Sequence, residues 1–140
     1  MKILAAVDGS PFTKRMLAYL AAHEQWLSPQ HSYTVMHSVP AIPPRAASQL
    51  NKDTLQEYYD DEAEKVFKPL RTFFKRHGVE PTFVAKVGHA ADNIARAADK
   101  GGFELVVLGS HGHGALTSLV LGSTATKVLA SCAVPVLLIR

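Results

Sequence analysis

Short runs of apolar residues recur along the chain, separated by longer segments in which apolar and polar residues are mixed. The first run, Lys2–Val7, is apolar after its first residue and shows no alternation of apolar and polar positions. A strand that is buried on both faces, as in a parallel sheet, has this pattern. Similar runs follow, and the five predicted strands are Lys2–Val7, Ser32–Val39, Pro81–Val87, Glu104–Leu108 and Val134–Ile139.

Between the predicted strands, apolar residues recur at the spacing of an α-helix. Ser10 is a suitable N-cap and Pro11 suits a first helical turn, so a helix is expected after the first strand. Its apolar positions continue from Met16 to Trp26. Two further short helices are expected over Ala90–Lys100 and Ser123–Ser131, and a loop over Pro40–Pro44.

The segment from about Asp53 to His77 predicts a long helix. One of its faces is broadly apolar, the opposite face is charged, and Gly78 follows in the position that commonly ends a helix. Pro69 lies inside the pattern and predicts a kink, because proline removes one helical hydrogen bond.

Strands and helices therefore alternate strictly along the chain. This order predicts an α/β fold, with one parallel sheet and helices on both of its faces. The chain has 140 residues, which is the length of one compact domain, so we expect a single domain over residues 1–140. Hydrophobic residues make up 47%, which is enough for a core, and no apolar run approaches the roughly 20 residues of a membrane-spanning helix.

Charge and cysteine content narrow the possible functions. The formal net charge is +3, but Lys and Arg are scattered, which favours solvated helix faces over a nucleic-acid surface. The lone Cys132 excludes an internal disulfide and a cysteine-cluster zinc site. The N-terminal apolar run is interrupted by Asp8 and Gly9, so it is too short for a signal peptide. We therefore expect a cytoplasmic protein.

Two predicted strands end in segments suited to a ligand. Asp8-Gly9-Ser10 follows the first strand, and a glycine-rich segment begins at Gly109 after the fourth. Open parallel sheets bind ligands beyond the carboxyl ends of their strands, where the strand order reverses. If the first and fourth strands are neighbours, both segments face one crevice.

The start of the last predicted helix suits a phosphate. Gly122, Ser123 and Thr124 would offer backbone N–H groups, the positive end of the helix dipole and two hydroxyls. Each of these features alone is more typical of a turn or a cap, but together they favour a nucleotide site. The P-loop pattern is absent, and Gly112-His113-Gly114 does not continue into G-x-G-x-x-G.

The glycines have the spacing G-x2-G-x9-G-[ST], matched by Gly109, Gly112, Gly122 and Ser123. With the opening segment 3–10 and the ending 134–139, this motif resembles the ATP-binding type of the universal stress protein family over the whole chain. The resemblance implies an open five-stranded parallel sheet of order 3-2-1-4-5, a fold of the adenine-nucleotide alpha-hydrolase-like kind. The reversal of strand order then falls between the first and fourth strands, as expected above.

The resemblance also implies a ligand, ATP with or without Mg²⁺, and a role for individual residues. Asp8 would contact the nucleoside, Ala6 and Val7 would line the base, and Ser38 would meet adenine through its backbone. Leu108, Gly109 and Gly112 would border the ribose and phosphates, and Gly122, Ser123 and Thr124 would hold the phosphate end. His111 stands where many relatives have arginine, which leaves the phosphate charge less well balanced at neutral pH.

Three functions remain in competition. The first is an ATP-binding stress-response or regulatory module, whose output is a change of conformation or partner. The second is a slow ATP hydrolase or phosphotransferase, which is disfavoured because no Lys or Arg lies between Gly101 and Gly122. The third is a nucleotide-free interaction protein, against which the intact glycine motif argues.

His111 and His113 are two residues apart and suggest a metal as an alternative. A zinc site would need at least one more ligand, for which His37 and His89 are candidates. Histidines that face solvent or phosphate are the favoured interpretation.

The resemblance also suggests how the chain assembles. Order 3-2-1-4-5 puts the strand Val134–Ile139 at a sheet edge, and an apolar edge invites pairing with another chain. Relatives commonly pair through this strand, so we expect a homodimer.

Overall fold

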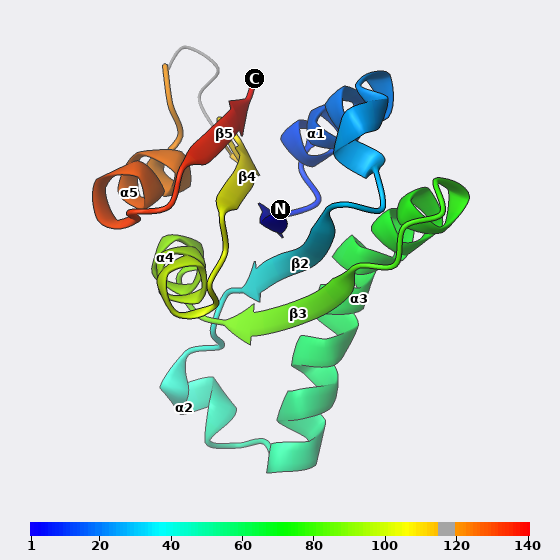
Figure 1. Ribbon diagram of the computed structural model, residues 1–140. Coiled ribbons are helices and arrows are strands. Elements are labelled where there is room, and N and C mark those ends of the chain that lie inside the picture. Colours follow the sequence, from blue (N-terminus) through cyan, green and yellow to red (C-terminus); the bar gives the residue numbers. More distant parts are fainter. Residues whose placement is uncertain (115–119) are drawn as a thin grey trace.

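The computed structural model describes residues 1–114 and 120–140. Its core is a five-stranded sheet in the order β3-β2-β1-β4-β5, with every neighbouring pair parallel (Figure 1). This confirms the predicted α/β fold and strand order. The strands are β1 (Lys2–Ala6), β2 (Ser32–Val39), β3 (Thr82–Val87), β4 (Leu105–Gly109) and β5 (Val136–Ile139).

Helices cover both faces of the sheet. The helix α1 and the long helix α3 pack on one face, and α4 and α5 pack on the other (Figure 1). None of the described helices combines the length and the apolar composition that crossing a bilayer requires. The bounds are α1 (Pro11–Ala22), α2 (Pro44–Ala47), α3 (Lys52–Arg76), α4 (Ala90–Lys100) and α5 (Ser123–Ser131), with a 3-10 turn η1 (Glu24–Leu27) after α1.

The central strand β1 explains why its sequence shows no alternation. Ile3 and Ala5 point into the core under α1 and α3, whereas Leu4 and Ala6 point into the core under α4 and α5. Ile3 and Leu4 are both completely buried. Each such side chain contributes about 1.5–3 kcal/mol to folding, so both faces of this strand select apolar residues.

The edge strand β3 differs from β1. The exposed residues of β3 are Thr82, Ala85, Lys86 and Val87. The strand pairs only with β2, and no helix fully covers the face that Lys86 shares with Val84. The expectation of uniformly buried strands therefore fails at this edge.

The strands predicted over Lys2–Val7, Pro81–Val87 and Glu104–Leu108 differ by one residue from β1, β3 and β4. Three other expected boundaries were wrong for identifiable reasons. The predicted loop Pro40–Pro44 ends in α2, which begins at Pro44, a position where proline costs no hydrogen bond. Trp26 lies in η1 rather than in α1, which ends before His23. The last strand begins at Val136, because Pro135 has no N–H to donate to the ladder, although its carbonyl accepts from Val106 N at 2.9 Å.

The long helix α3 begins one residue before its predicted start. The Asn51 side chain caps it by accepting from Thr54 N at 2.7 Å. The helix continues through the exposed Pro69 and ends at Arg76, before Gly78, whose φ is +69°. A positive φ favours glycine, as the sequence suggested.

Candidate functional site

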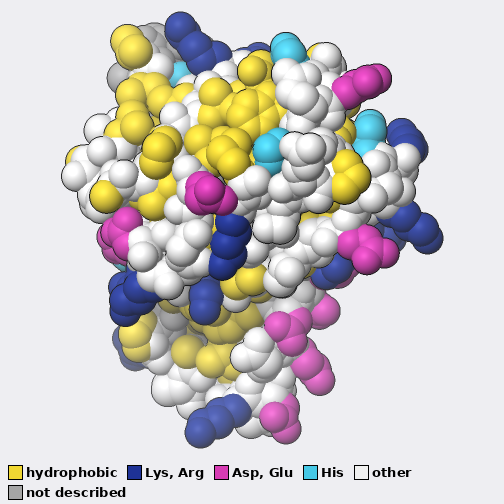
Figure 2. Space-filling model, viewed as in Figure 1, with side chains coloured by type: hydrophobic (Ala, Val, Ile, Leu, Met, Phe, Trp, Pro, Cys, Tyr) yellow, Lys and Arg dark blue, Asp and Glu magenta, His cyan; other side chains and the backbone are white. Residues whose placement is uncertain are grey.

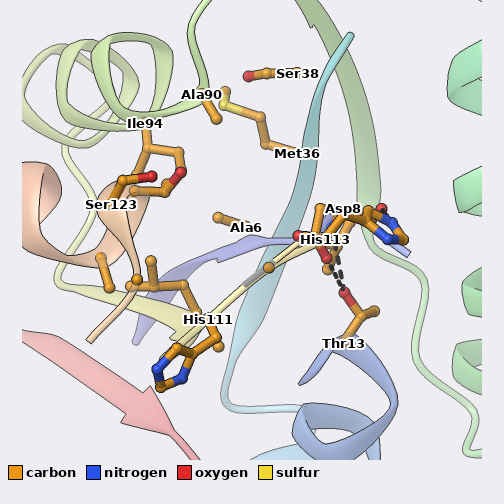
Figure 3. Close-up of a pocket in the computed structure, with 18 residues that line it drawn as sticks. Ala6, Asp8, Thr13, Met36, Ser38, Ala90, Ile94, His111, His113 and Ser123 are labelled. Carbon is orange, nitrogen blue, oxygen red and sulfur yellow. Dashed lines mark hydrogen bonds between the residues drawn. The ribbon is translucent and has the colours of Figure 1, made fainter. Parts of the chain in front are cut away.

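A cavity of about 450 Å³ opens beyond the carboxyl ends of β1 and β4 (Figure 3). The two strands are neighbours, so the turn after β1 and the loop after β4 meet at this edge of the sheet. The start of α5 and the start of α4 close the cavity from the other side. A volume of a few hundred Å³ is typical of small-molecule sites.

The structure brings all ten residues predicted to bind the ligand to this one cavity. They come from β1, β2, β4, the loops after β1 and β4, and the start of α5. Binding itself stays a prediction, but their convergence is a finding. The ten lining residues are Ala6, Val7, Asp8, Ser38, Leu108, Gly109, Gly112, Gly122, Ser123 and Thr124.

The Asp8 carboxylate is fixed by the turn that follows β1. Its Oδ1 accepts from Ser10 N at 2.9 Å and from Thr13 Oγ1 at 3.1 Å. Thr13 Oγ1 in turn accepts from the backbone N of Asp8 and of Gly9, each at 3.2 Å. Gly9 has a φ of +76°, which favours glycine. The turn therefore holds one carboxylate oxygen and leaves Oδ2 beside the loop that follows β4.

The loop after β4 needs glycine because other parts of the protein come very close to it. A Cβ on Gly112 would lie 2.5 Å from Asp8 Oδ2, and a Cβ on Gly109 would lie 2.7 Å from the Cβ of Phe12. A Cβ on Gly122 would lie 3.1 Å from His111 Cα, and Gly122 N donates to Ser110 O at 2.7 Å. Three glycines of the motif thus pack the loop against the turn after β1, against α1 and against the start of α5.

The polar end of the cavity lies at the start of α5. Gly122 is the N-cap and provides no side-chain hydrogen bond to the first turn. Ser123 and Thr124 both line the cavity. First-turn N–H groups that no side chain caps, together with the helix dipole, suit an anion such as phosphate.

The part of the cavity formed by the sheet is largely apolar, and its residues Ala6, Met36 and Leu108 are at most 8% exposed. Ala90 and Ile94 of α4 add further apolar lining. Sequence reasoning missed Met36, Ala90 and Ile94. Met36 lies two residues before Ser38 in β2 and so on the same face of the strand, a signal that the sequence offered.

Sequence reasoning also missed Thr13. It is only 5% exposed, lines the cavity and holds Asp8. The signal was its place in the first turn of α1, where a hydroxyl can reach back to the strand end.

The histidines do not gather into a metal site in the described part of the chain. His113 Nε2 lies 2.7 Å from Asp8 O, and His37 Nδ1 lies 2.8 Å from Val7 O. His111 Nδ1 lies 2.9 Å from Ser110 Oγ, and its ring points away from Asp8, whereas His113 lies beside it (Figure 3). Over residues 1–114 and 120–140, no group of three His, Cys, Asp or Glu could hold a metal ion.

Among the described lining residues, the titratable groups are Asp8, His111 and His113, with no Lys or Arg. Backbone N–H groups and hydroxyls are therefore the main donors that the cavity offers to an anion. Donors of this kind can bind phosphate without a formal positive charge.

An open parallel sheet with a cavity at the point where its strand order reverses defines a class of ligand-binding α/β proteins. Within this class, the whole chain, residues 1–140, matches the model of the universal stress protein family, and the chain belongs to that family.

Two relatives support this membership. The universal stress protein encoded in the QAH/OAS sulfhydrylase 3' region of Thermus aquaticus is 33% identical, with 99% of this chain and 97% of the relative covered. The universal stress protein Slr1230 of Synechocystis is 31% identical, also over 99% of this chain. The chain spans only 42% of the length of the Synechocystis protein.

Solved structures share the fold at lower sequence identity. The hypothetical protein MJ0577 superposes with a TM-score of 0.83 at 21% identity, with 99% of this chain and 94% of that chain covered. The universal stress protein of Archaeoglobus fulgidus in complex with dAMP gives 0.69 at 22% identity, covering 100% and 98%. An Arabidopsis thaliana family member with AMP bound gives 0.71 at 14% identity, covering 99% and 90%.

Proposed function

We propose that this protein binds ATP at the cavity beyond β1 and β4 and acts in the cytoplasm as a nucleotide-dependent stress-response or regulatory module. The observation that carries the proposal is the convergence of all ten predicted residues on one cavity, which combines apolar residues of the sheet with polar donors at the start of α5. The adenine nucleotides bound by the Archaeoglobus and Arabidopsis proteins of the same fold support the choice of ligand.

The proposed direction of the ligand follows from the polarity of the lining residues. Adenine lies against the apolar residues Ala6 and Met36, within reach of Ser38. The phosphates lie at the start of α5, where Ser123 and Thr124 add hydroxyls to the backbone donors. Asp8, beside Gly112 in the loop that follows β4, contacts the nucleoside.

Charge balance makes a divalent cation a useful companion of the nucleotide. ATP carries several negative charges, and the described lining residues include no Lys or Arg. Mg²⁺ prefers oxygen ligands and is commonly held by one or two carboxylates together with substrate phosphates. The Asp8 carboxylate and the phosphates would form such a set, and Mg²⁺ would neutralise part of the phosphate charge.

The same charge balance favours binding over rapid turnover. Phosphoryl transfer needs a cation at the transferring phosphate and a group that orients the nucleophile. Asp8 already accepts two hydrogen bonds at Oδ1, from Ser10 and Thr13, which suits a positioning role. A slow ATP hydrolase is therefore the second candidate.

We further propose a homodimer that uses β5. This strand is at one edge of the sheet, and Val136, Leu137 and Leu138 are only partly buried in the single chain. Pairing of two such edges around a two-fold axis would bury these side chains without leaving an open edge. Light scattering should give twice the mass of one chain, and Leu137→Lys should shift the mass toward one chain.

The test of the nucleotide proposal compares ATP with inorganic tripolyphosphate by calorimetry, with and without Mg²⁺. We expect micromolar-range binding of ATP to the wild-type protein. Without Mg²⁺, Asp8→Ala should weaken ATP more than tripolyphosphate, because Asp8 contacts the nucleoside. Absence of heat and of thermal stabilisation at millimolar ATP would refute the proposal, and equal losses for the two ligands without Mg²⁺ would refute the place given to Asp8.

A further inference from the structure

A second cavity, of about 480 Å³, lies between α4 and the edge of the sheet at β3, and we name it the α4–β3 groove. One wall is the face of the sheet formed by Thr34 and Met36 of β2 and by Thr82, Val84 and Lys86 of β3. Residues two apart on a strand share a face, and the register pairs Thr34 with Thr82 and Met36 with Val84. The wall is therefore one continuous patch of sheet.

The other wall is one side of α4. Asn93, Arg96, Ala97 and Lys100 all line the groove, and their spacing of three or four residues places them along one side of the helix. From Asn93 to Lys100 the helix rises by about 10 Å. An extended segment of roughly three or four residues would cover this length.

Four cationic side chains surround the groove: Lys2, Lys86, Arg96 and Lys100. In Figure 2, Lys and Arg side chains gather left of centre, in the region of α4 and the neighbouring β3, next to exposed hydrophobic side chains. Within the described part of the chain, Lys86, Arg96 and Lys100 form no ion pair with an acidic residue. These three cations therefore have no direct acidic partner among the described residues, although α4 also carries the exposed Asp92 and Asp99.

The remaining cation has partners that orient it. The Lys2 ammonium donates to Gly101 O and lies 4.7 Å from the centre of the Phe103 ring. The nearby Glu104 carboxylate accepts from the backbone N of Lys2 at 2.7 Å, which places one acid at this end of the groove. Lys86 and Arg96 line the rest of the groove.

The floor of the groove shows which polyanion fits. Val84 and Ala97 are partly exposed and provide apolar surface between the cations, whereas Met36 is only 3% exposed and Lys2 lies over the Phe103 ring. A small phosphate would leave this surface uncovered. A single nucleic-acid strand would need aromatic rings on which bases stack, but Lys2 already lies over the ring of Phe103. An acidic peptide with an apolar residue between its acids matches both the charge and the floor.

We propose that the α4–β3 groove binds a short acidic segment of a partner protein, in an extended conformation, with an apolar residue against Val84 and Ala97. Its acids pair with Lys86, Arg96 and Lys100. This site goes beyond the proposed nucleotide function. It does not depend on that function, because peptide binding is measured in the absence of nucleotide.

The groove also adjoins the nucleotide cavity. Met36 lines both, and Asn93 Nδ2 donates to Ser38 Oγ at 3.2 Å and to Val87 O at 3.3 Å. A partner segment in the groove would therefore lie beside Met36, which also lines the nucleotide cavity, and beside Asn93, which bonds to the cavity residue Ser38.

The test is fluorescence anisotropy with a fluorescein-labelled peptide in which pairs of glutamates flank a leucine. A second peptide with glutamine in place of glutamate is the control for charge. We expect the acidic peptide to bind, and Arg96→Glu/Lys100→Glu to weaken it by about tenfold or more. Lys68→Glu/Lys75→Glu is the matched control, because it makes the same change of charge at exposed positions of α3, and it should lower affinity by less than about threefold.

Circular dichroism and thermal unfolding verify that all variants are folded, and the four positions are exposed, so their exchange should leave the core intact. The proposal fails if both double variants lower affinity equally, or if the glutamine peptide binds as well as the acidic one. It also fails if tripolyphosphate or a single-stranded oligonucleotide displaces the labelled peptide at lower concentration than unlabelled peptide does.

Discussion

The cavity beyond β1 and β4 and the α4–β3 groove share Met36, yet they are lined by different kinds of atoms. The cavity is built from glycines, hydroxyls and the start of a helix, with no Lys or Arg among its described lining residues. The groove is built from cationic side chains on regular elements. Loops that approach other groups closely shape the first, and packing of a helix over a sheet shapes the second.

This difference affects how each site would respond to change. A backbone-built site depends on the path of its loops, so one added methyl group can displace several contacts. A site built from long exposed side chains tolerates small changes of shape, but its affinity depends on charge and salt. Four predictions separate the two sites, from the largest expected effect to the smallest.

Gly112→Val should have the largest effect. Even a Cβ at this position would lie 2.5 Å from Asp8 Oδ2, so the loop or the carboxylate must move. We expect ATP affinity to fall by about 100-fold and the acidic peptide to bind within about twofold of wild type. Calorimetry and anisotropy on one preparation check this.

Gly122→Ala should lower ATP affinity by a smaller amount and is therefore compared with Gly112→Val. Its added Cβ would lie 3.1 Å from His111 Cα, a milder conflict, and its φ of −74° suits alanine. It should weaken ATP by less than Gly112→Val. Equal loss of ATP and peptide in either variant would mean that the two sites are not separable.

Salt should separate the two ligands next. Raising NaCl from about 0.05 M to about 0.5 M screens exposed charges strongly. The acidic peptide should lose about tenfold in affinity, because its contacts are exposed Lys and Arg side chains. ATP should lose less, since backbone donors and hydroxyls contact it. A parallel decline of both affinities would contradict the distinction between the sites.

Thr13→Val should have a smaller and more local effect. It removes the hydroxyl that bonds Asp8 Oδ1 and accepts from two backbone N–H groups, at a side chain that is 5% exposed. Leaving such groups unpaired costs about 1–3 kcal/mol of the free energy of unfolding, measured in urea. ATP binding should weaken severalfold and peptide binding should not change. Thr13→Ser, which keeps the hydroxyl, is the control.

Tyr33 should affect neither ligand, because it lines neither site. Burial raises its pKa to about 12, and its hydroxyl donates to Trp26 O at 2.6 Å. The folded state therefore keeps the tyrosine proton at a pH where the unfolded chain loses it. This contribution to stability, at most about 2–3 kcal/mol, is complete below pH 10 and is lost as the pH rises toward 12.

Between pH 10 and 12, the free energy of unfolding of Tyr33→Phe should decrease less than that of the wild type. Urea unfolding at several pH values measures this difference. At neutral pH the variant should be less stable by about 1 kcal/mol, the usual worth of one hydrogen bond. If the free energy of unfolding of the variant decreased with pH as steeply as that of the wild type, groups other than Tyr33 would cause the decrease.

Much of the fold was readable in the sequence, because local rules determined it. The doubly buried strand β1 has apolar residues on both faces, and Ser10 and Pro11 start α1 where expected. The strand order came from the family resemblance rather than from the residues themselves. Local rules failed where two signals competed. Pro44 is one case, because proline is typical of loops and is also favoured as the first residue of a helix.

The candidate site was also largely readable, and for a specific reason. Its glycines lie where a backbone must pass close to another group, and such positions disfavour any side chain, so they leave a motif with fixed spacing. Residues that a motif does not fix, such as Thr13 and Ile94, were missed, because helix spacing alone does not say which side chain faces a ligand.

The α4–β3 groove left no motif at all. Its cations come from Lys2, Lys86 and α4, which are far apart in sequence and appear there as scattered solvated charges. Only the tertiary structure places them together, because strand register and the position of α4 over the sheet depend on packing of the whole core. The sequence by itself determined the elements and the loops that need glycine, whereas side-chain clusters from distant segments were decided by how those elements pack.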